Sequence, residues 1–398
     1  MSKKICKKVF LVSILLTLSL TTSCWNNRDI TDIAIAVGVG LDKTDSGEIE
    51  LTIEMVNPSA IHSEEGAGGG SGNLQSSVEI SASGTTVFAA ARNLIGYSSK
   101  KMFFSHIQVV IIGESLARDG LKEIIDFWER DHETRRKADF LIAKGTTAKE
   151  ILKAQTQIEN LTSIHLMKSL EASESGGKIQ KITLFDIIQQ IHEPGRSVVI
   201  GIISPGGSSE AAYIEDMELQ GASVFKHGRL TGFLSPTETR GFLFATDKIQ
   251  STLLTIPNPL LPEKLFAVEV LNSNGNIEAK FDENQLMLKI EVEATGNLGE
   301  IIGEKNLAKF DLLDTLQKNL EEGIKDEINQ VVKIAQQEYQ SDIFGFGGEL
   351  YRKQYKKWLE LEDNWENIFS NTPIEIEVKF NLNTSGLIIE PAFSDIKE

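Results

Sequence analysis

Eight apolar residues near the C-terminus recur at spacings of three and four, and this pattern constrains the fold more than any other feature of the sequence. The series consists of Leu313, Leu316, Leu320, Ile324, Ile328, Val331, Ala335 and Tyr339. This spacing puts all the side chains on one side of an α-helix, and that side has to be covered by another element. The sequence therefore predicts a long helix within residues 305–340 that packs on a second layer.

The second layer is predicted to be an antiparallel sheet. Residues 286–294 and 374–382 alternate between apolar and polar side chains, which is typical of strands with one face in water. Two more short strands are expected at 264–271 and 276–282, and a second helix at 349–361. We therefore expect an α+β domain over residues 213–398, in which the long helix and its shorter partner cover one face of the sheet.

Residues 24–204 follow a different pattern, in which apolar strands alternate with amphipathic helices. Strands are expected at 48–56, 78–84, 107–112, 140–143 and 198–203, and helices at 85–95, 116–129, 147–154, 158–172 and 183–192. This order predicts a mixed α/β region of one or two subdomains. Residues 63–77 are expected to form a flexible Gly-rich loop, and the polar residues 205–212 a linker to the C-terminal domain, which begins with a hairpin near residues 222–234.

The first 24 residues have the pattern of an export signal. Four Lys before position 9 are followed by the weakly polar to apolar residues 9–20, then by small residues and Cys24. This run is shorter than the roughly 20 apolar residues that cross a bilayer. We expect a lipoprotein signal peptide over residues 1–23, with a diacylglycerol and an N-acyl lipid on Cys24, although Thr21 occupies the usual aliphatic position. A plain secretory signal is the alternative.

Charge and cysteine content exclude several classes of protein. The net charge is −17, and it becomes −21 once residues 1–23 with their four Lys are removed, which excludes a nucleic-acid partner. Both cysteines, Cys6 and Cys24, lie in the first 24 residues, so the folded part has no disulfide framework or thiolate metal site. We therefore expect no metal and no cofactor apart from the lipid on Cys24.

Catalytic motifs do not emerge from the sequence. It contains neither a His pair at i and i+4 nor a Gly-x-Ser-x-Gly motif. The cluster at 129–133 (Glu-Arg-Asp-His-Glu) could supply a base and two acids, but such a cluster is typical of a solvated helix end. The sequence therefore predicts a protein that is not an enzyme and acts by association.

Two phenylalanines, Phe344 and Phe346, flank a glycine in the break between the two predicted C-terminal helices. A Gly-rich loop that presents phenylalanine is a candidate partner-binding element. The alternative is that both rings fill the space between the helices. Trp358 and Trp365 are expected to anchor the core or an interface.

Five segments together resemble one family. Residues 24–30 (Cys-Trp-Asn-Asn-Arg-Asp-Ile) and 34–42 are similar to the start of the mature C subunits of spore nutrient-germinant receptors, the Ger(x)C lipoproteins. The family's most characteristic block resembles residues 83–131, and its C-terminal signature resembles residues 221–232 and 342–347 with the two tryptophans that follow. The resemblance extends from Cys24 to about residue 391.

This resemblance implies a non-enzymatic, lipid-anchored receptor subunit needed for nutrient-triggered germination. Its implied partners are the integral membrane A and B subunits and the lipid bilayer, and its implied location is the outward face of the cell membrane or the spore inner membrane. A solute-binding lipoprotein that delivers a ligand to a transporter is the competing interpretation. That class usually has two similar α/β lobes, whereas the two halves of this sequence differ.

Overall fold

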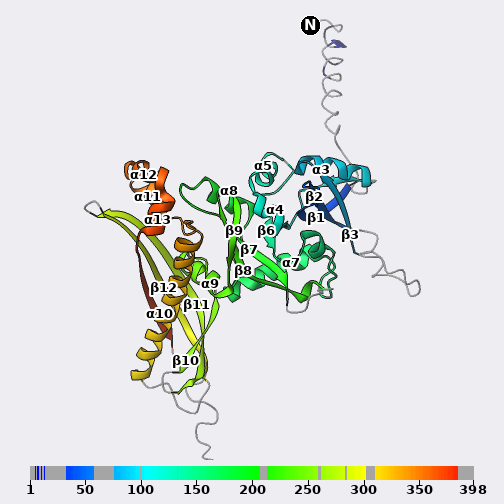
Figure 1. Ribbon diagram of the computed structural model, residues 1–398. Helices are drawn as coiled ribbons and strands as arrows, with labels where there is room; N and C mark the ends of the chain where they lie inside the picture. Colours follow the sequence, from blue (N-terminus) through cyan, green and yellow to red (C-terminus); the bar gives the residue numbers. More distant parts are fainter. Residues whose placement is uncertain are drawn as a thin grey trace, which may run out of the picture.

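Two β-sheets organise the chain (Figure 1). The computed structural model describes residues 33–57, 76–98, 100–131, 133–206, 213–258, 261–282, 285–301 and 310–383, together with residues 5, 7, 8, 10 and 13. The expected fold class is confirmed, because a mixed α/β region comes first and a sheet packed by a long helix follows.

Within these residues the first sheet has nine strands, in the order β3-β2-β1-β5-β6-β7-β8-β9, and β4 also pairs with β1. The strands are β1 (Ile33–Lys43), β2 (Ile49–Val56), β3 (Ser77–Gly84), β4 (Lys101–Phe103), β5 (Val109–Gly113), β6 (Asp139–Ala143), β7 (Val199–Pro205), β8 (Met217–Lys226) and β9 (Arg229–Leu234). Strands β1, β5, β6 and β7 are parallel, and antiparallel hairpin strands extend the sheet on both sides.

Helices cover both faces of the first sheet. One face packs against α3 (Val87–Leu94), α4 (Glu114–Asp119), α5 (Lys122–Arg130) and α8 (Leu184–His192), and the other against α6 (Ala148–Lys153) and α7 (Thr162–Ser173). Val110 and Ile112 of β5 enter the first core, and Val109 and Ile111 enter the second. Short 3-10 turns, η2 (Ile95–Tyr97), η3 (Glu174–Gly176) and η4 (Ile214–Asp216), complete this region.

One helix expected in this region is divided in two. The predicted helix at 116–129 breaks between α4 and α5, because Gly120 adopts a φ of 137°, which a helix cannot accommodate. The remaining helices and strands expected between residues 48 and 203 are present, with small shifts at their ends.

Two buried carboxylates attach α6 and α7 to the sheet. Asp42, at the end of β1, accepts hydrogen bonds of 2.9 Å from the backbone N–H groups of Ala148 and Lys149. Glu54 of β2 accepts 2.8 Å bonds from the N–H groups of Thr162 and Ser163. Both acids therefore satisfy the free N–H groups of a helix N-terminus.

The second sheet has four strands in the described residues, in the order β10-β11-β12-β13. They are β10 (Thr252–Asn258), β11 (Leu261–Asp282), β12 (Gln285–Ile301) and β13 (Ile374–Asn383). The expected strands at 264–271 and 276–282 are one strand, whose pairing register shifts between Val270 and Asn272. The prediction of a wholly antiparallel sheet is wrong for β13, which runs parallel to β12 because a helical crossover connects them.

The long helix is confirmed as α10 (Phe310–Lys333), which continues into the π-helix η5 (Ile334–Glu338). Six residues of the apolar series, from Leu316 to Ala335, are fully buried. The other helices around this core are α9 (Pro236–Ala245), α11 (Phe346–Lys353), α12 (Tyr355–Leu361), η6 (Glu362–Asn364) and α13 (Trp365–Asn371). The expected helix at 349–361 is therefore two helices, separated at Gln354.

The first sheet continues beyond the predicted linker at 205–212. Strands β8 and β9, expected to begin the C-terminal domain, pair with β7 and with each other instead. The hairpin is confirmed, and it joins the first sheet rather than the second, because a local turn pattern does not specify which sheet receives the hairpin. Val224 and Leu234 of this hairpin also contact the second core, so the two sheets share a buried boundary.

Candidate functional site

A buried carboxylate, Asp342, organises the segment that joins the long helix to α11. Its side chain accepts hydrogen bonds of 2.8 Å from the N–H groups of Gly345 and Gly347 and of 3.1 Å from the indole Nε1 of Trp365. Burial raises the pKa of Asp342, while the three donors act in the opposite direction. The carboxylate therefore holds the Phe-Gly-Phe-Gly segment in one conformation, and Gly345 supplies the left-handed turn at a φ of 98°.

Phe344 and Phe346 are only 1% and 0% exposed, so the prediction that they dock a partner is wrong. Their ring centroids lie 5.9 Å apart, and the ring of Phe346 is 6.2 Å from that of Phe369. Because Asp342 fixes the backbone, both rings are buried, that of Phe344 against Phe242 of α9 and that of Phe346 against Phe369 of α13. The alternative interpretation, in which they fill the space between the helices, agrees with the structure.

The same segment connects the two sheets. Ser197, which precedes β7, donates its N–H to the carbonyl of Asp342 at 2.8 Å, and its hydroxyl lies 2.6 Å from that of Ser341. Trp358 and Trp365 stack edge to face at 5.4 Å against Gly195, where a Cβ would come within 3 Å of both rings. The tryptophans are therefore anchors of the boundary between the sheets.

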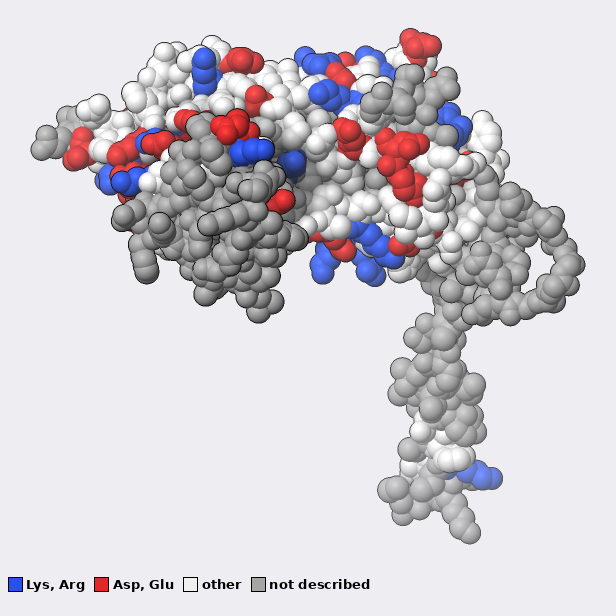
Figure 2. All heavy atoms as spheres, turned by 90° about the horizontal axis from the view of Figure 1, so that it is seen from below, with Lys and Arg blue, Asp and Glu red and all other residues white. Residues whose placement is uncertain are grey.

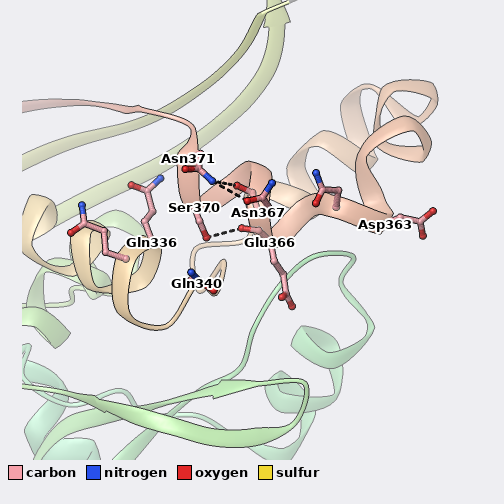
Figure 3. A pocket seen from close by; sticks show the side chains of 9 residues that line it. Gln336, Gln340, Asp363, Glu366, Asn367, Ser370 and Asn371 are labelled. Carbon is pink, nitrogen blue, oxygen red and sulfur yellow. Dashed lines mark hydrogen bonds between the residues drawn. The ribbon is translucent and has the colours of Figure 1, made fainter.

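A polar pocket of about 510 Å³ opens beside this boundary (Figure 3). It lies between the π-helix and α13, and its lining includes Gln336, Gln340, Asn367 and Asn371. Gln336 donates to the carbonyls of Phe369 and Thr372, which ties the π-helix to α13. Glu366 at the same pocket pairs with Lys226 at 3.0 Å and with His227 at 2.9 Å in the β8–β9 turn. The pocket offers hydrogen-bonding amides and an ion pair across the boundary between the sheets.

A larger and mostly apolar groove lies at the other end of the first sheet. This α3–α5 groove has a volume of about 1260 Å³ and is bounded by α3, η2, β4 and α5. Phe88, Ile95 and Phe127 line it, and the ring of Phe88 lies 6.4 Å from that of Phe127. An apolar groove of this size is suited to binding apolar groups of a partner.

The remaining predicted residues have these positions. Cys24 and most of the Gly-rich segment at 63–77 lie outside the described residues. In the cluster at 129–133, Arg130 pairs with Asp126 at 2.9 Å and Glu133 with Lys101 at 3.3 Å, as expected for a solvated helix end. Over the part of the chain that the structure describes, no group of three or more metal-ligating side chains occurs. Nor is any helix in that part both long and apolar enough to span a membrane.

Comparison with known families accounts for both halves of the chain. Residues 26–205 match the family model described as "Spore germination protein N-terminal domain", and residues 220–386 match "Spore germination B3/ GerAC like, C-terminal". The chain belongs to the Ger(x)C family. The interval between the two matches overlaps the predicted linker, although the first sheet extends through it to β9.

Whole-length relatives support the same assignment. Spore germination protein KC of Bacillus subtilis (strain 168) is 26% identical, over 98% of this chain and 99% of its own length. Spore germination protein B3 of the same organism is 23% identical, over 92% and 94%. The crystal structure of the GerBC protein has a TM-score of 0.53 and 18% identity, and covers 87% of this chain and 96% of its own. The names of proteins KC and B3 do not describe a catalytic activity.

Two acids in the segments that resemble the Ger(x)C family have structural roles. Asp42 ends the first matched apolar strand and attaches α6, and Asp342 begins the C-terminal signature and fixes its glycines. Sequence reasoning missed the buried position of Asp342, although an acid directly before an apolar, Gly-rich run was a usable signal. It also missed the α3–α5 groove, whose signal was the presence of Phe88 and Ile95 in addition to the apolar residues that face the core.

Proposed function

We propose that the chain is the lipid-anchored subunit of a spore nutrient-germinant receptor and that it acts by association rather than catalysis. In this proposal Cys24 carries the diacylglycerol and N-acyl chains, and the folded body faces outward from the spore inner membrane. Its partners are the integral membrane A and B subunits. The observation that carries the proposal is the full-length similarity to spore germination proteins such as KC and B3.

Two features of the chain support the anchoring step. Residues 9–20 followed by Cys24 form the pattern of a lipoprotein signal. The mature chain carries a net charge of −21 after loss of the four Lys in residues 1–23, so electrostatic attraction cannot hold it on an anionic membrane. Acyl chains supply that attachment, at ~0.8 kcal/mol for each buried CH₂. The two unlike sheets do not favour the solute-binding alternative with similar lobes.

The test is fractionation of cells that produce the chain without its partner subunits. We expect the wild type in the membrane fraction and Cys24→Ala in the soluble fraction. Cys6→Ala is the matched control, because that cysteine lies within the signal and its loss leaves the anchor intact. A Cys24→Ala protein that still sediments with membranes contradicts the anchor. Co-purification of the A and B subunits from detergent-solubilised spore membranes then tests the association.

A further inference from the structure

We propose that the α3–α5 groove, with the outer side of α3 and η2 that forms its rim, lies against the membrane that carries the protein. This inference rests on the proposed function, because it requires the lipid on Cys24. It concerns a different part of the molecule from the signal itself. The occupant of the groove is the boundary between headgroups and acyl chains of the bilayer.

The outer side of α3 and η2 exposes large apolar residues beside the polar Arg92 and Asn93. Helix α3 buries Val87, Ala90 and Leu94 against the first sheet, which is the expected behaviour of an amphipathic helix. Its opposite side then presents Phe88, which is 55% exposed, followed by Ile95 at 56% and Tyr97 at 72% in η2. An amphipathic surface helix normally carries polar groups on that side. Three large apolar residues there indicate a surface that is covered by something else.

The chain connects this surface closely to Cys24. Ile33, the first residue of β1, pairs with Lys101 of β4, and Lys101 lines the groove. Cys24 lies nine residues before Ile33. Whatever path those residues take, they span at most ~30 Å, since a fully extended chain covers ~3.3–3.6 Å per residue. A lipid on Cys24 therefore keeps Ile33, which pairs with Lys101 at the groove, within about that distance of the bilayer.

The charges that line the groove nearly balance. Five Lys and Arg and four Asp and Glu line it, which leaves it nearly neutral in a mature chain with a net charge of −21. Figure 2 shows acidic and basic side chains interspersed over the face of the described residues that it presents. The groove is thus a part of the surface that an anionic bilayer repels little.

The basic side chains also have a geometry suited to an interface. The guanidinium carbon of Arg92 lies 5.0 Å from the centroid of the Phe88 ring, so charge and aromatic surface are adjacent. Long cationic side chains that keep their charge in the headgroup layer beside buried aromatic rings are typical of proteins that lie on a membrane. A protein partner is the other possible occupant, and the experiment below distinguishes it.

The experiment uses the lipidated full-length chain, with a fluorophore that responds to polarity attached at Ile95→Cys. Cys6 is removed with the signal and the thiol of Cys24 is acylated, so the introduced thiol is the free one. The protein is reconstituted into vesicles of phosphatidylcholine and phosphatidylglycerol with or without nitroxide-labelled lipid. Ile158→Cys is the matched control, because Ile158 is 74% exposed and precedes α7, on the opposite face of the sheet from α3.

We expect a blue-shifted emission at position 95 and quenching by the nitroxide lipid several-fold stronger than at position 158. Equal and weak quenching at both positions, in protein that sediments with the vesicles, overturns the inference and leaves the anchor intact. A blue shift at position 95 that requires added A and B subunits also overturns it, because the occupant is then a protein. Protein that does not sediment with the vesicles contradicts the proposed function, and the inference fails with it.

Discussion

The two sheets of this protein differ in how many of their faces are covered by helices. The first sheet has helices on both faces, so β5 and β6 consist of buried residues alone. The second sheet is covered on one face by α9, α10 and α11, and β13 alternates between covered and exposed positions. A sheet with two covered faces has no wet side on which to place charge, whereas a sheet with one covered face does.

This difference determines where charged residues lie. In the first sheet Asp42, Glu54 and Asp139 are all less than 9% exposed, and two of the three are paired with helix N-termini. In the second sheet Lys289, Glu291 and Glu377 form a cluster of ion pairs on the uncovered face. Among the residues of the strands, charge is thus part of the internal structure in the first sheet and a surface property in the second. The predictions that follow test this contrast.

The largest effect is expected at the covered face of the second region, at Phe346. Phe346→Ala removes a fully buried ring that packs against Phe344 and Phe369, and such a cavity costs ~3–5 kcal/mol of the free energy of unfolding. The measurement is chemical denaturation of residues 24–398, with tryptophan fluorescence as the signal that monitors unfolding. Leu359→Ala is the control, because Leu359 is 49% exposed and its truncation should cost less than ~0.5 kcal/mol. Equal losses for the two variants would show that the ring is not core.

The burial of Phe346 shows what sequence patterns could and could not predict. The apolar series from Leu313 to Tyr339 gave the long helix, because its periodicity is local. The fate of the two phenylalanines depends on Asp342, whose carboxylate bonds Gly345, Gly347 and Trp365, a residue 23 positions away. A contact at that separation has no periodic signature. A Gly-rich run alone therefore indicated a loop without indicating whether its side chains point inward.

The prediction of strand pairing was limited in the same way, because local patterns identify strands but do not specify how distant strands pair. Alternation identified residues 374–382 as a strand with one wet face, but not its direction, which follows from the crossover through α10 to α13. The groove was missed for a related reason. Only the assembled sheet shows that Val87, Ala90 and Leu94 occupy the inner side of α3, which leaves Phe88 of α3 and Ile95 of η2 exposed.

An intermediate effect is expected from buried charge in the first region, at Asp139. This carboxyl is 6% exposed and one of its oxygens has no hydrogen-bond partner in the described residues. Burial, assisted by Glu174 and Glu171, raises its pKa to about 6 against the pull of Lys181. Because the folded pKa exceeds the unfolded value of 3.8, its contribution to stability is fully present below pH 3.8 and is lost as the pH rises through 6.

Asp139→Asn stays neutral and avoids that loss. The measured quantity is the unfolding free energy of the variant minus that of the wild type. We expect this difference to increase by about 2 kcal/mol from pH 4 to pH 7. Asp126→Asn is the matched control. Its hydrogen bond to Arg130 lowers the pKa of Asp126, so this substitution should not reproduce the gain. A wild type and an Asp139→Asn variant with parallel pH profiles would mean that the carboxyl is not desolvated.

The smallest effect is expected on the uncovered face of the second sheet, at Lys289. Its ammonium lies 2.8 Å from Glu291 and 2.9 Å from Glu377, and these bonds raise the pKa of Lys289. Water and salt screen such pairs, so Lys289→Met should leave the denaturation midpoint unchanged at physiological ionic strength and lower it measurably only at low salt.

Ile290→Val is the control on the next residue, whose side chain faces the core and is 0% exposed. It should cost about 0.5–1.5 kcal/mol at either salt concentration, because the loss of a buried methylene is not screened. If Lys289→Met destabilised the protein more than Ile290→Val at physiological salt, the uncovered face would be held by its charges and the contrast between the two sheets would fail.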